Sequence, residues 1–417
     1  LCITRPDVIA DIHKGFLDAG ADIIETNSFG STSVVLAEYG LADQARRLNR
    51  EAALIARRVA DEAGDRERTR FVAGSMGPTT KTISVTGGIT FDDLAFSYYE
   101  QALGLIEGGV DLLLLETSQD TINVKAGLDG IDRAMAELDV EVAVAVQGTI
   151  ELMGTLLAGQ DAEAFYISLS HRDLLWLGFN CATGPEFMTD HIRTLASLSH
   201  FPVSCVPNAG LPDEDGNYNE SPENLVSTIG RFVESGWVNV VGGCCGTRPE
   251  HIRSLAAMVD GKRPRDLPVQ SETRVSGIEG LLIDEDIRPC IVGERTNVLG
   301  SRRFRKLIGE GAFEVASEIG RRQIRNGAHI LDVCLQDPDR EELSDITDFL
   351  GFLTRKVKSP IMVDSTDHHV IEEALKMLQG KSIINSINLE DGEIRFEQVV
   401  PLAKRYGAAL VVGCIDD

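Results

Sequence analysis

The strongest constraint on the fold of this chain is a regular alternation of short apolar runs, rich in Val, Ile and Leu, with longer amphipathic stretches. This pattern is typical of βα units on a parallel sheet. A first series predicts strands at residues 22–29, 70–77, 111–117, 141–147, 174–181, 201–208 and 238–245. A second series predicts strands at residues 290–296, 329–335, 361–366, 382–388 and 409–415. We therefore expect an α/β protein with two tandem (β/α)₈ barrels of the TIM type, the first without its first strand and the second truncated after about five strands.

Helices and a linker complete this interpretation. We predict helices at residues 6–19, 32–63, 118–137 and 367–379, the last capped by Thr366 or Asp367 and ended by Gly380. Proline and glycine among charges at residues 261–289 indicate a linker between domains at residues 1–260 and 290–417. Because the chain opens on a helix and closes on a strand, we expect it to be a piece of a longer protein. An open doubly wound sheet is the alternative architecture, but no Gly-x-Gly-x-x-Gly stretch opens a helix.

The composition limits the partners. Lys and Arg total 40 against 65 Asp and Glu in 417 residues, and the net charge of −25 repels nucleic acid phosphates and anionic membranes. No apolar run approaches the roughly 18 residues that span a bilayer, and no secretory signal opens the chain. We therefore expect a cytoplasmic protein that binds neither nucleic acid nor membranes. In that reducing compartment, clustered cysteines are more often metal-binding or catalytic than disulfide-bonded.

Polar residues follow the first series of predicted strands. A βα barrel carries its site at the carboxyl ends of the strands, which meet at one rim. The residues at those positions are Glu25, Asn27, Ser28, Ser75, Gly77, Glu116, Thr117, Gln147, Asn180, Cys181, Asn208 and the segment 242–246.

Three cysteines in this set predict a metal centre. Adjacent strand residues point to opposite faces, so Cys244 and Cys245 can reach one ion only where the backbone turns, and the flanking glycines allow that turn. Cys181 ends another strand and supplies a third sulfur. Three cysteines hold zinc with a fourth position open for substrate, whereas a structural site would need a fourth cysteine, for which Cys205 is the rival. An open site of this kind keeps a bound thiol deprotonated, which favours alkyl transfer to sulfur.

Two further features suit an amino-acid substrate. Glu116 follows an apolar run and is suited to the substrate ammonium, although a helix N-terminal charge is an equally good interpretation. The glycine-bearing turn at residues 74–79, which includes Ser75 and Met76, offers backbone amides to the substrate carboxylate.

The first 260 residues resemble the homocysteine S-methyltransferase family. The resemblance rests on residues 22–30, 74–78, 116–117, 178–181, 207–210 and 242–251. It implies a (β/α)₈ barrel with a zinc ion held by Cys181, Cys244 and Cys245. It also implies that Glu116 contacts the homocysteine amino group and that Asn208 lies near the metal.

Residues 292–301, 361–366 and 383–388 resemble the pterin-binding barrel of the cobalamin-dependent methionine synthase family, which is related to dihydropteroate synthase. The resemblance implies that Asn297, Asp364 and Asn385 bind the pterin ring of methyltetrahydrofolate, with Asp332 beside them. Helix capping by Asp364 and a turn role for Asn385 are the alternatives. The chain departs from many relatives at Cys334, where they carry asparagine.

Together these resemblances imply methyl transfer to zinc-bound homocysteine, giving methionine. Methylcobalamin is then the immediate donor and 5-methyltetrahydrofolate the source of the methyl group. No Asp-x-His-x-x-Gly stretch occurs, so we expect the cobalamin-binding domain to lie outside this chain. Two alternatives stay open: a cobalamin-independent homocysteine methyltransferase that uses S-methylmethionine or betaine, and a non-catalytic zinc- or pterin-binding module. For His368 and His369 we prefer exposed or capping roles over metal binding.

Overall fold

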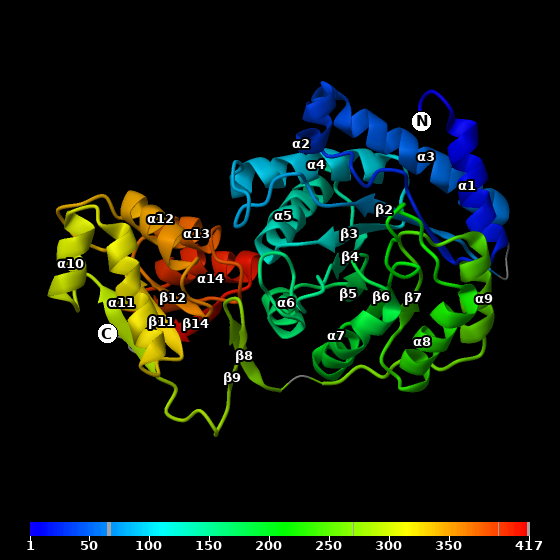
Figure 1. The fold of residues 1–417 in the computed structure, drawn as a ribbon. Helices are drawn as coiled ribbons and strands as arrows, with labels where there is room; N and C mark the ends of the chain where they lie inside the picture. The colour runs from blue at the N-terminus through cyan, green and yellow to red at the C-terminus, as the bar shows by residue number, and fades with distance from the viewer. Residues whose placement is uncertain (65–67, 270, 391, 415–417) are drawn as a thin grey trace. The chain divides into compact units, whose positions relative to one another are not determined.

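The computed structural model describes residues 1–64, 68–269, 271–390 and 392–414. The chain divides into two compact units, which Figure 1 shows with their elements labelled. The first unit comprises residues 1–158 and 173–269, and the second comprises residues 159–172 and 270–417. No helix in the described part of the chain is both long enough and apolar enough to cross a membrane.

The first unit is built on a parallel sheet whose strands pair in chain order. Each strand is followed by helical structure, and this order is consistent with a TIM-type barrel. The strands are β1 (Ile23–Glu25), β2 (Phe71–Met76), β3 (Leu112–Ser118), β4 (Ala143–Gly148), β5 (Trp176–Asn180), β6 (Val203–Val206) and β7 (Val240–Val241). The helices of this unit are α1 (Pro6–Asp18), α2 (Ser33–Leu36), α3 (Ala45–Ala63), α4 (Phe91–Glu107), α5 (Thr121–Leu138), α7 (Pro185–Leu198), α8 (Pro222–Glu234) and α9 (Pro249–Val259).

One face of this sheet carries an apolar layer below the site. Its buried members are Ala73, Leu112, Leu114, Ala145 and Trp176, with Ile23 and Val240 packed against them. Because side chains alternate along a strand, the residues two positions further on share this face. These are Glu25, Ser75, Glu116 and Gln147, so polar groups lie directly above an apolar floor at the carboxyl ends of the strands.

The predicted helix at residues 32–63 is wrong as a single element. After the short helix α2, two 3₁₀ turns at Ala37–Tyr39 and Ala42–Gln44 separate it from α3. Gly40 lies between the turns with φ +68°, a left-handed conformation that ends a helix and that glycine adopts without strain.

The second unit contains a five-stranded parallel sheet, again paired in chain order. Its strands are β10 (Val292–Asn297), β11 (Ile330–Cys334), β12 (Ile361–Asp364), β13 (Ile383–Ile387) and β14 (Ala409–Val412). Its helices are α6 (Ala162–Leu169), α10 (Arg302–Gly309), α11 (Phe313–Arg325), α12 (Glu342–Leu353), α13 (His368–Leu375) and α14 (Ile394–Tyr406). The last strand was predicted to reach residue 415, which lies outside the described residues.

The segment predicted as a linker, residues 261–289, contains an antiparallel hairpin. Its strands are β8 (Thr273–Ser276) and β9 (Gly280–Ile283). Val275 is buried with Ile330, Met362 and Ile383, which lie near the starts of β11, β12 and β13. The hairpin therefore covers the amino ends of the second sheet. Prolines and charges around two strands of only four residues concealed this role in the sequence.

Candidate metal and substrate site

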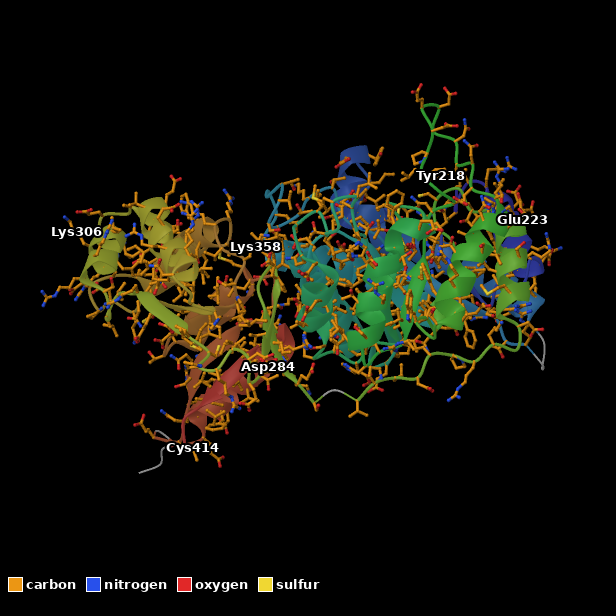
Figure 2. The ribbon with its side chains drawn as sticks, turned by 60° about the horizontal axis from the view of Figure 1, so that its bottom comes forward. Tyr218, Glu223, Asp284, Lys306, Lys358 and Cys414 are labelled. Atoms are coloured by element: carbon orange, nitrogen blue, oxygen red, sulfur yellow. The ribbon has the colours of Figure 1, made fainter. Side chains whose placement is uncertain are left out.

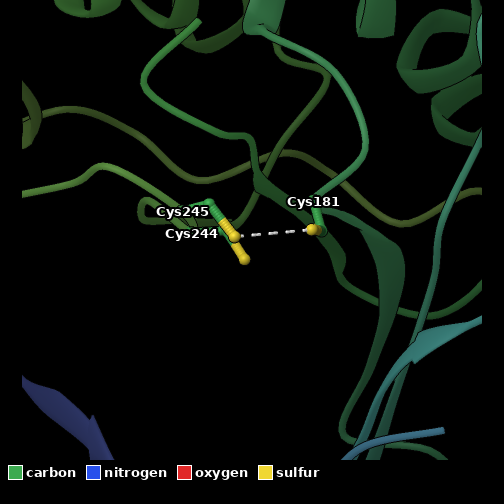
Figure 3. Close-up of side chains that lie close together, drawn as sticks. All are labelled: Cys181, Cys244 and Cys245. Atoms are coloured by element: carbon green, nitrogen blue, oxygen red, sulfur yellow. Dashed lines mark hydrogen bonds between the residues drawn. The ribbon is translucent and has the colours of Figure 1, made fainter. Parts of the chain in front are cut away.

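Three cysteine sulfurs converge at the carboxyl ends of β5 and β7. Cys181 directly follows β5, and Cys244 and Cys245 follow β7. The Sγ atoms of Cys181 and Cys245 are 3.8 Å apart, and all three Sγ atoms lie within 4.8 Å of one another (Figure 3). Cys245 is exposed and the other two are half-buried, so the cluster is open to a substrate.

Backbone geometry explains how neighbouring residues 244 and 245 both reach the cluster. The N–H of Cys244 donates to the carbonyl of Pro207 at 2.8 Å, and the N–H of Cys245 donates to Oδ1 of Asn208 at 3.1 Å. These bonds fix the turn that follows β7 against the turn that follows β6. Across from them, Cys181 has φ +59°, a strained left-handed conformation for a residue with a Cβ.

Tyr218 also contacts the cluster, and sequence reasoning missed it. Its phenol hydrogen bonds with the Cys245 side chain, and its ring packs over Gly246, where a Cβ would lie 2.2 Å from the Tyr218 Cβ. Tyr218 belongs to the loop between β6 and α8 and is labelled in Figure 2. Nothing in its local sequence points to a sulfur, because the contact depends on where this loop folds.

The cluster shifts the pKa values of two of its cysteines in opposite directions. Interactions with the Cys181 thiol and then with the Cys244 thiol hold the pKa of Cys245 far below its usual range. The pKa of Cys244 is raised instead, because its hydrogen bonds with Cys181 and Cys245 and its burial favour the neutral thiol. Three sulfurs this close together form a natural site for a soft cation.

The donor set fits zinc. With Zn–S bonds of about 2.3 Å, a tetrahedral site spaces its sulfurs about 3.8 Å apart, which is the distance between Cys181 and Cys245. Cys205 is fully buried beside Met188, with Sγ 3.9 Å from its sulfur, and does not belong to the group.

Within the described ranges, the other possible metal-binding group is Asp367, His368 and His369. Asp367 caps α13 by accepting from the His369 N–H at 2.8 Å. The positive end of the helix dipole opposes a cation there, which agrees with the capping role expected from the sequence.

A buried carboxylate lies on the same face of the sheet. Glu116 is 4% exposed and accepts from the Ser75 hydroxyl at 2.5 Å and from Asn180 Nδ2 at 3.1 Å. Burial and then the charge of Glu25 raise the pKa of Glu116 well above its usual value. Because this environment disfavours an isolated carboxylate, a cationic ligand group would stabilise its ionised form.

The predicted substrate residues are only partly brought together. Ser75 contacts Glu116, whereas Met76 is buried on the opposite face of β2. It shares that face with Gly74, where a Cβ would touch Leu105 of α4. Any contribution of Met76 to a substrate must therefore come from its backbone.

Glu25 is the last residue of β1, and the sequence alone assigns it no role. Its side chain reaches solvent on the same face as Ser75 and Glu116, yet desolvation by the surrounding protein raises its pKa to about 7. Two neighbouring carboxylates of raised pKa make this part of the site suited to a positively charged group.

The predicted pterin residues gather in the second unit. Asn297 Nδ2 donates to Asp332 at 3.2 Å and to Asp364 at 3.3 Å, and Asn385 pairs in register with Asp364. Burial raises the pKa of Asp332 to about 6, against hydrogen bonds from Asn297 and Asn385. Oδ1 of Asp332 is buried without a hydrogen-bond partner, as expected of a group that awaits a ligand.

Cys334, at which the sequence resemblance leads us to expect asparagine, lies near the predicted pterin residues in the sheet. It ends β11 and is buried, and burial raises the pKa of its thiol to about 12. The thiol is therefore neutral and offers little to a pterin edge.

Comparisons with known proteins agree with this geometry. Residues 293–417 match the model of the pterin-binding enzyme family. Two solved structures are similar in fold, the oxidized and metallated forms of the homocysteine methyltransferase MmuM from Escherichia coli. Both are 21% identical to this chain, with TM-scores of 0.51 and 0.50, and the matches cover 61% of this chain and 86% of theirs. Residues 1–259 match the model of the homocysteine S-methyltransferase family, to which this chain belongs.

Proposed function

We propose that the chain transfers a methyl group to the thiolate of homocysteine at a zinc ion held by Cys181, Cys244 and Cys245. The observation that carries this proposal is the convergence of the three Sγ atoms within 4.8 Å. Bound zinc would keep the substrate sulfur deprotonated near neutral pH. Glu116 would take the substrate ammonium, backbone amides near Ser75 and Met76 its carboxylate, and Asn208 would hold the Cys245 turn.

The second unit supports a proposal for the methyl donor. We infer that 5-methyltetrahydrofolate is the source of the methyl group and that methylcobalamin, bound by a separate domain, is the immediate donor. The pterin-binding match at residues 293–417 supports this proposal. Asn297, Asp332, Asp364 and Asn385 would hydrogen bond the amide and amino edge of the pterin.

This proposal includes the finer architecture expected from the sequence. The two parallel sheets would belong to tandem TIM-type barrels, with domains at residues 1–260 and 290–417. A cytoplasmic location would suit free thiols, which a reducing compartment preserves.

A second candidate is direct transfer without cobalamin, from S-methylmethionine or betaine. The similarity in fold to a homocysteine methyltransferase that matches only part of this chain favours it. The donors are distinguished by supplying homocysteine with methylcobalamin or with S-methylmethionine and measuring methionine by mass spectrometry. Turnover with S-methylmethionine alone would favour the second candidate.

X-ray absorption at the zinc edge tests the site itself. Zinc-loaded protein should show three sulfur ligands, and a fourth should appear when homocysteine is added. Four sulfurs before addition, or three after it, would contradict a catalytic site and favour a structural metal.

A further inference from the structure

We propose that Asn180 is a positioning residue that couples recognition of the homocysteine amino group at Glu116 to the sulfur cluster. This inference rests on the proposed function and assigns one side chain a role in both halves of the site. Asn180 is the last residue of β5, directly precedes Cys181 and is fully buried.

One amide group reaches both halves. Asn180 Nδ2 lies 3.1 Å from Oε2 of Glu116, 2.8 Å from Oγ1 of Thr117 and 3.8 Å from Sγ of Cys244. Its Oδ1 accepts from the backbone N–H of Thr117 at 2.8 Å. Since a backbone N–H can only donate, this bond fixes the amide orientation and directs Nδ2 toward the carboxylate and the sulfur.

The bonds to Thr117 matter because they hold an irregular part of β3. Pairing between β3 and β4 shifts register between Leu115 and Ser118, and Thr117 has φ +54°. A left-handed residue with a branched side chain is strained and persists only where its surroundings hold it. This irregular segment includes Glu116. The orientation of the Glu116 carboxylate therefore depends on Asn180.

The contact with Cys244 has a separate consequence. When a metal is bound and Cys244 is its thiolate ligand, an N–H directed at the sulfur withdraws charge from it and orients it, as outer hydrogen-bond partners do at metal sites. Removing the amide therefore changes the electronic environment of a metal bound by Cys244 at the same time as it releases Glu116.

The test compares homocysteine with 4-mercaptobutanoate, which lacks only the amino group. Cobalt-loaded protein reports binding through the sulfur-to-cobalt charge-transfer band. In the parent protein, homocysteine should bind more tightly than the analogue. We expect Asn180→Ala to reduce this preference about ten-fold and to shift the band before any ligand is added.

A double-mutant cycle isolates the coupling. Glu116→Gln should remove the preference, and Asn180→Ala added to it should cause no further loss. Asn180→Asp keeps an acceptor for Thr117 while losing the donors, so it serves if the alanine variant does not fold. Asn49→Ala is the matched control, because Asn49 is fully buried in the same unit and donates to the carbonyls of Ser31 and Ala45.

The outcomes separate this inference from the proposed function. Failure of the parent protein to bind homocysteine would overturn the proposed function. Parent binding with an unchanged preference in both Asn180 variants would overturn only the role of Asn180. Asn180 would have only a structural role if Asn180→Ala weakened the binding of homocysteine and of 4-mercaptobutanoate equally. The same conclusion would follow if Asn49→Ala also shifted the charge-transfer band.

Discussion

The amide oxygen of Asn208 accepts a hydrogen bond from the backbone N–H of Cys245 at 3.1 Å. The loop after β6 thus holds the turn that carries two of the three clustered cysteines. The carbonyl of Cys245 completes the link by accepting from the N–H of Ala209 at 2.9 Å. Asn208 is 3% exposed, and its buried side chain holds the backbone at Cys245 through this hydrogen bond.

Replacing Asn208 should therefore weaken metal binding through the backbone. We expect Asn208→Ala to lower zinc affinity by about 10- to 100-fold, the range typical of outer-shell partners, when measured by competition with a chelator. Asn208→Asp keeps an acceptor for the Cys245 N–H and should retain most of the affinity. Equal affinities of the parent and alanine proteins would contradict this role.

The cysteine cluster makes a direct prediction about metal content. Purified protein should contain about one zinc per chain, and Cys245→Ala should lose most of it because two sulfurs are too few ligands. Cys205→Ala removes a sulfur that is buried outside the cluster and should keep the metal. Metal analysis of the three proteins side by side decides the question, and zinc retained in Cys245→Ala would exclude the proposed ligand set.

His13 should make the first unit sensitive to acid. It is 6% exposed with Nε2 unpartnered, and burial lowers its pKa to about 4. Between pH 6.5 and 4 the unfolded chain binds the extra proton, so the free energy of unfolding falls as the pH falls. The loss by pH 5 is about 2 kcal/mol.

Removing the imidazole tests this pH effect. His13→Leu should remove that part of the pH dependence when urea unfolding is compared at pH 8 and pH 5. The same pH dependence in both proteins would show that other groups cause it.

The ionised carboxylate of Asp332 should lower the free energy of unfolding of the chain without ligand. Burial raises its pKa to about 6, so ionisation at neutral pH opposes folding. Asp332→Asn should raise the free energy of unfolding at pH 7.5 by on the order of 2 kcal/mol. The gain should shrink as the pH falls toward 4, where the parent carboxyl is protonated in the folded chain and about half protonated in the unfolded chain. Urea unfolding at the two pH values measures it. A loss of stability at pH 7.5 would show that the charge is compensated in the folded chain.

Each predicted strand overlaps an observed strand because the signal is local, although the strands predicted at 22–29 and 238–245 are much shorter, at Ile23–Glu25 and Val240–Val241. Apolar runs such as 111–117 and 329–335 correspond to β3 and β11 within a residue or two. Errors arose where the local signal was ambiguous. Gly40 interrupts an amphipathic stretch that otherwise reads as one helix, and the hairpin of β8 and β9 has strands too short to show a period.

In the candidate site, too, the sequence reveals residues with a local signal and misses those that depend on distant contacts. Cys244 and Cys245 stand out because adjacent cysteines among glycines are unusual, and Cys181 follows from its place at a strand end. The sequence does not single out a role for Tyr218, Asn180 or Glu25, because their interactions at the site involve residues distant in the chain. Asn180 and Cys244, for example, are separated by 64 positions.

The sequence alone determined the two series of strands, the family and the three sulfur ligands we propose, since periodicity and residue type are properties of short segments. The tertiary structure decided which neighbours hold those groups in place. Strand register decides the irregularity at Glu116 and Thr117 and the hydrogen bonds that Asn180 makes to it. The path of a loop brings Tyr218 to Cys245. Strand register and loop paths are set by packing across the whole sheet, which no short segment of sequence encodes.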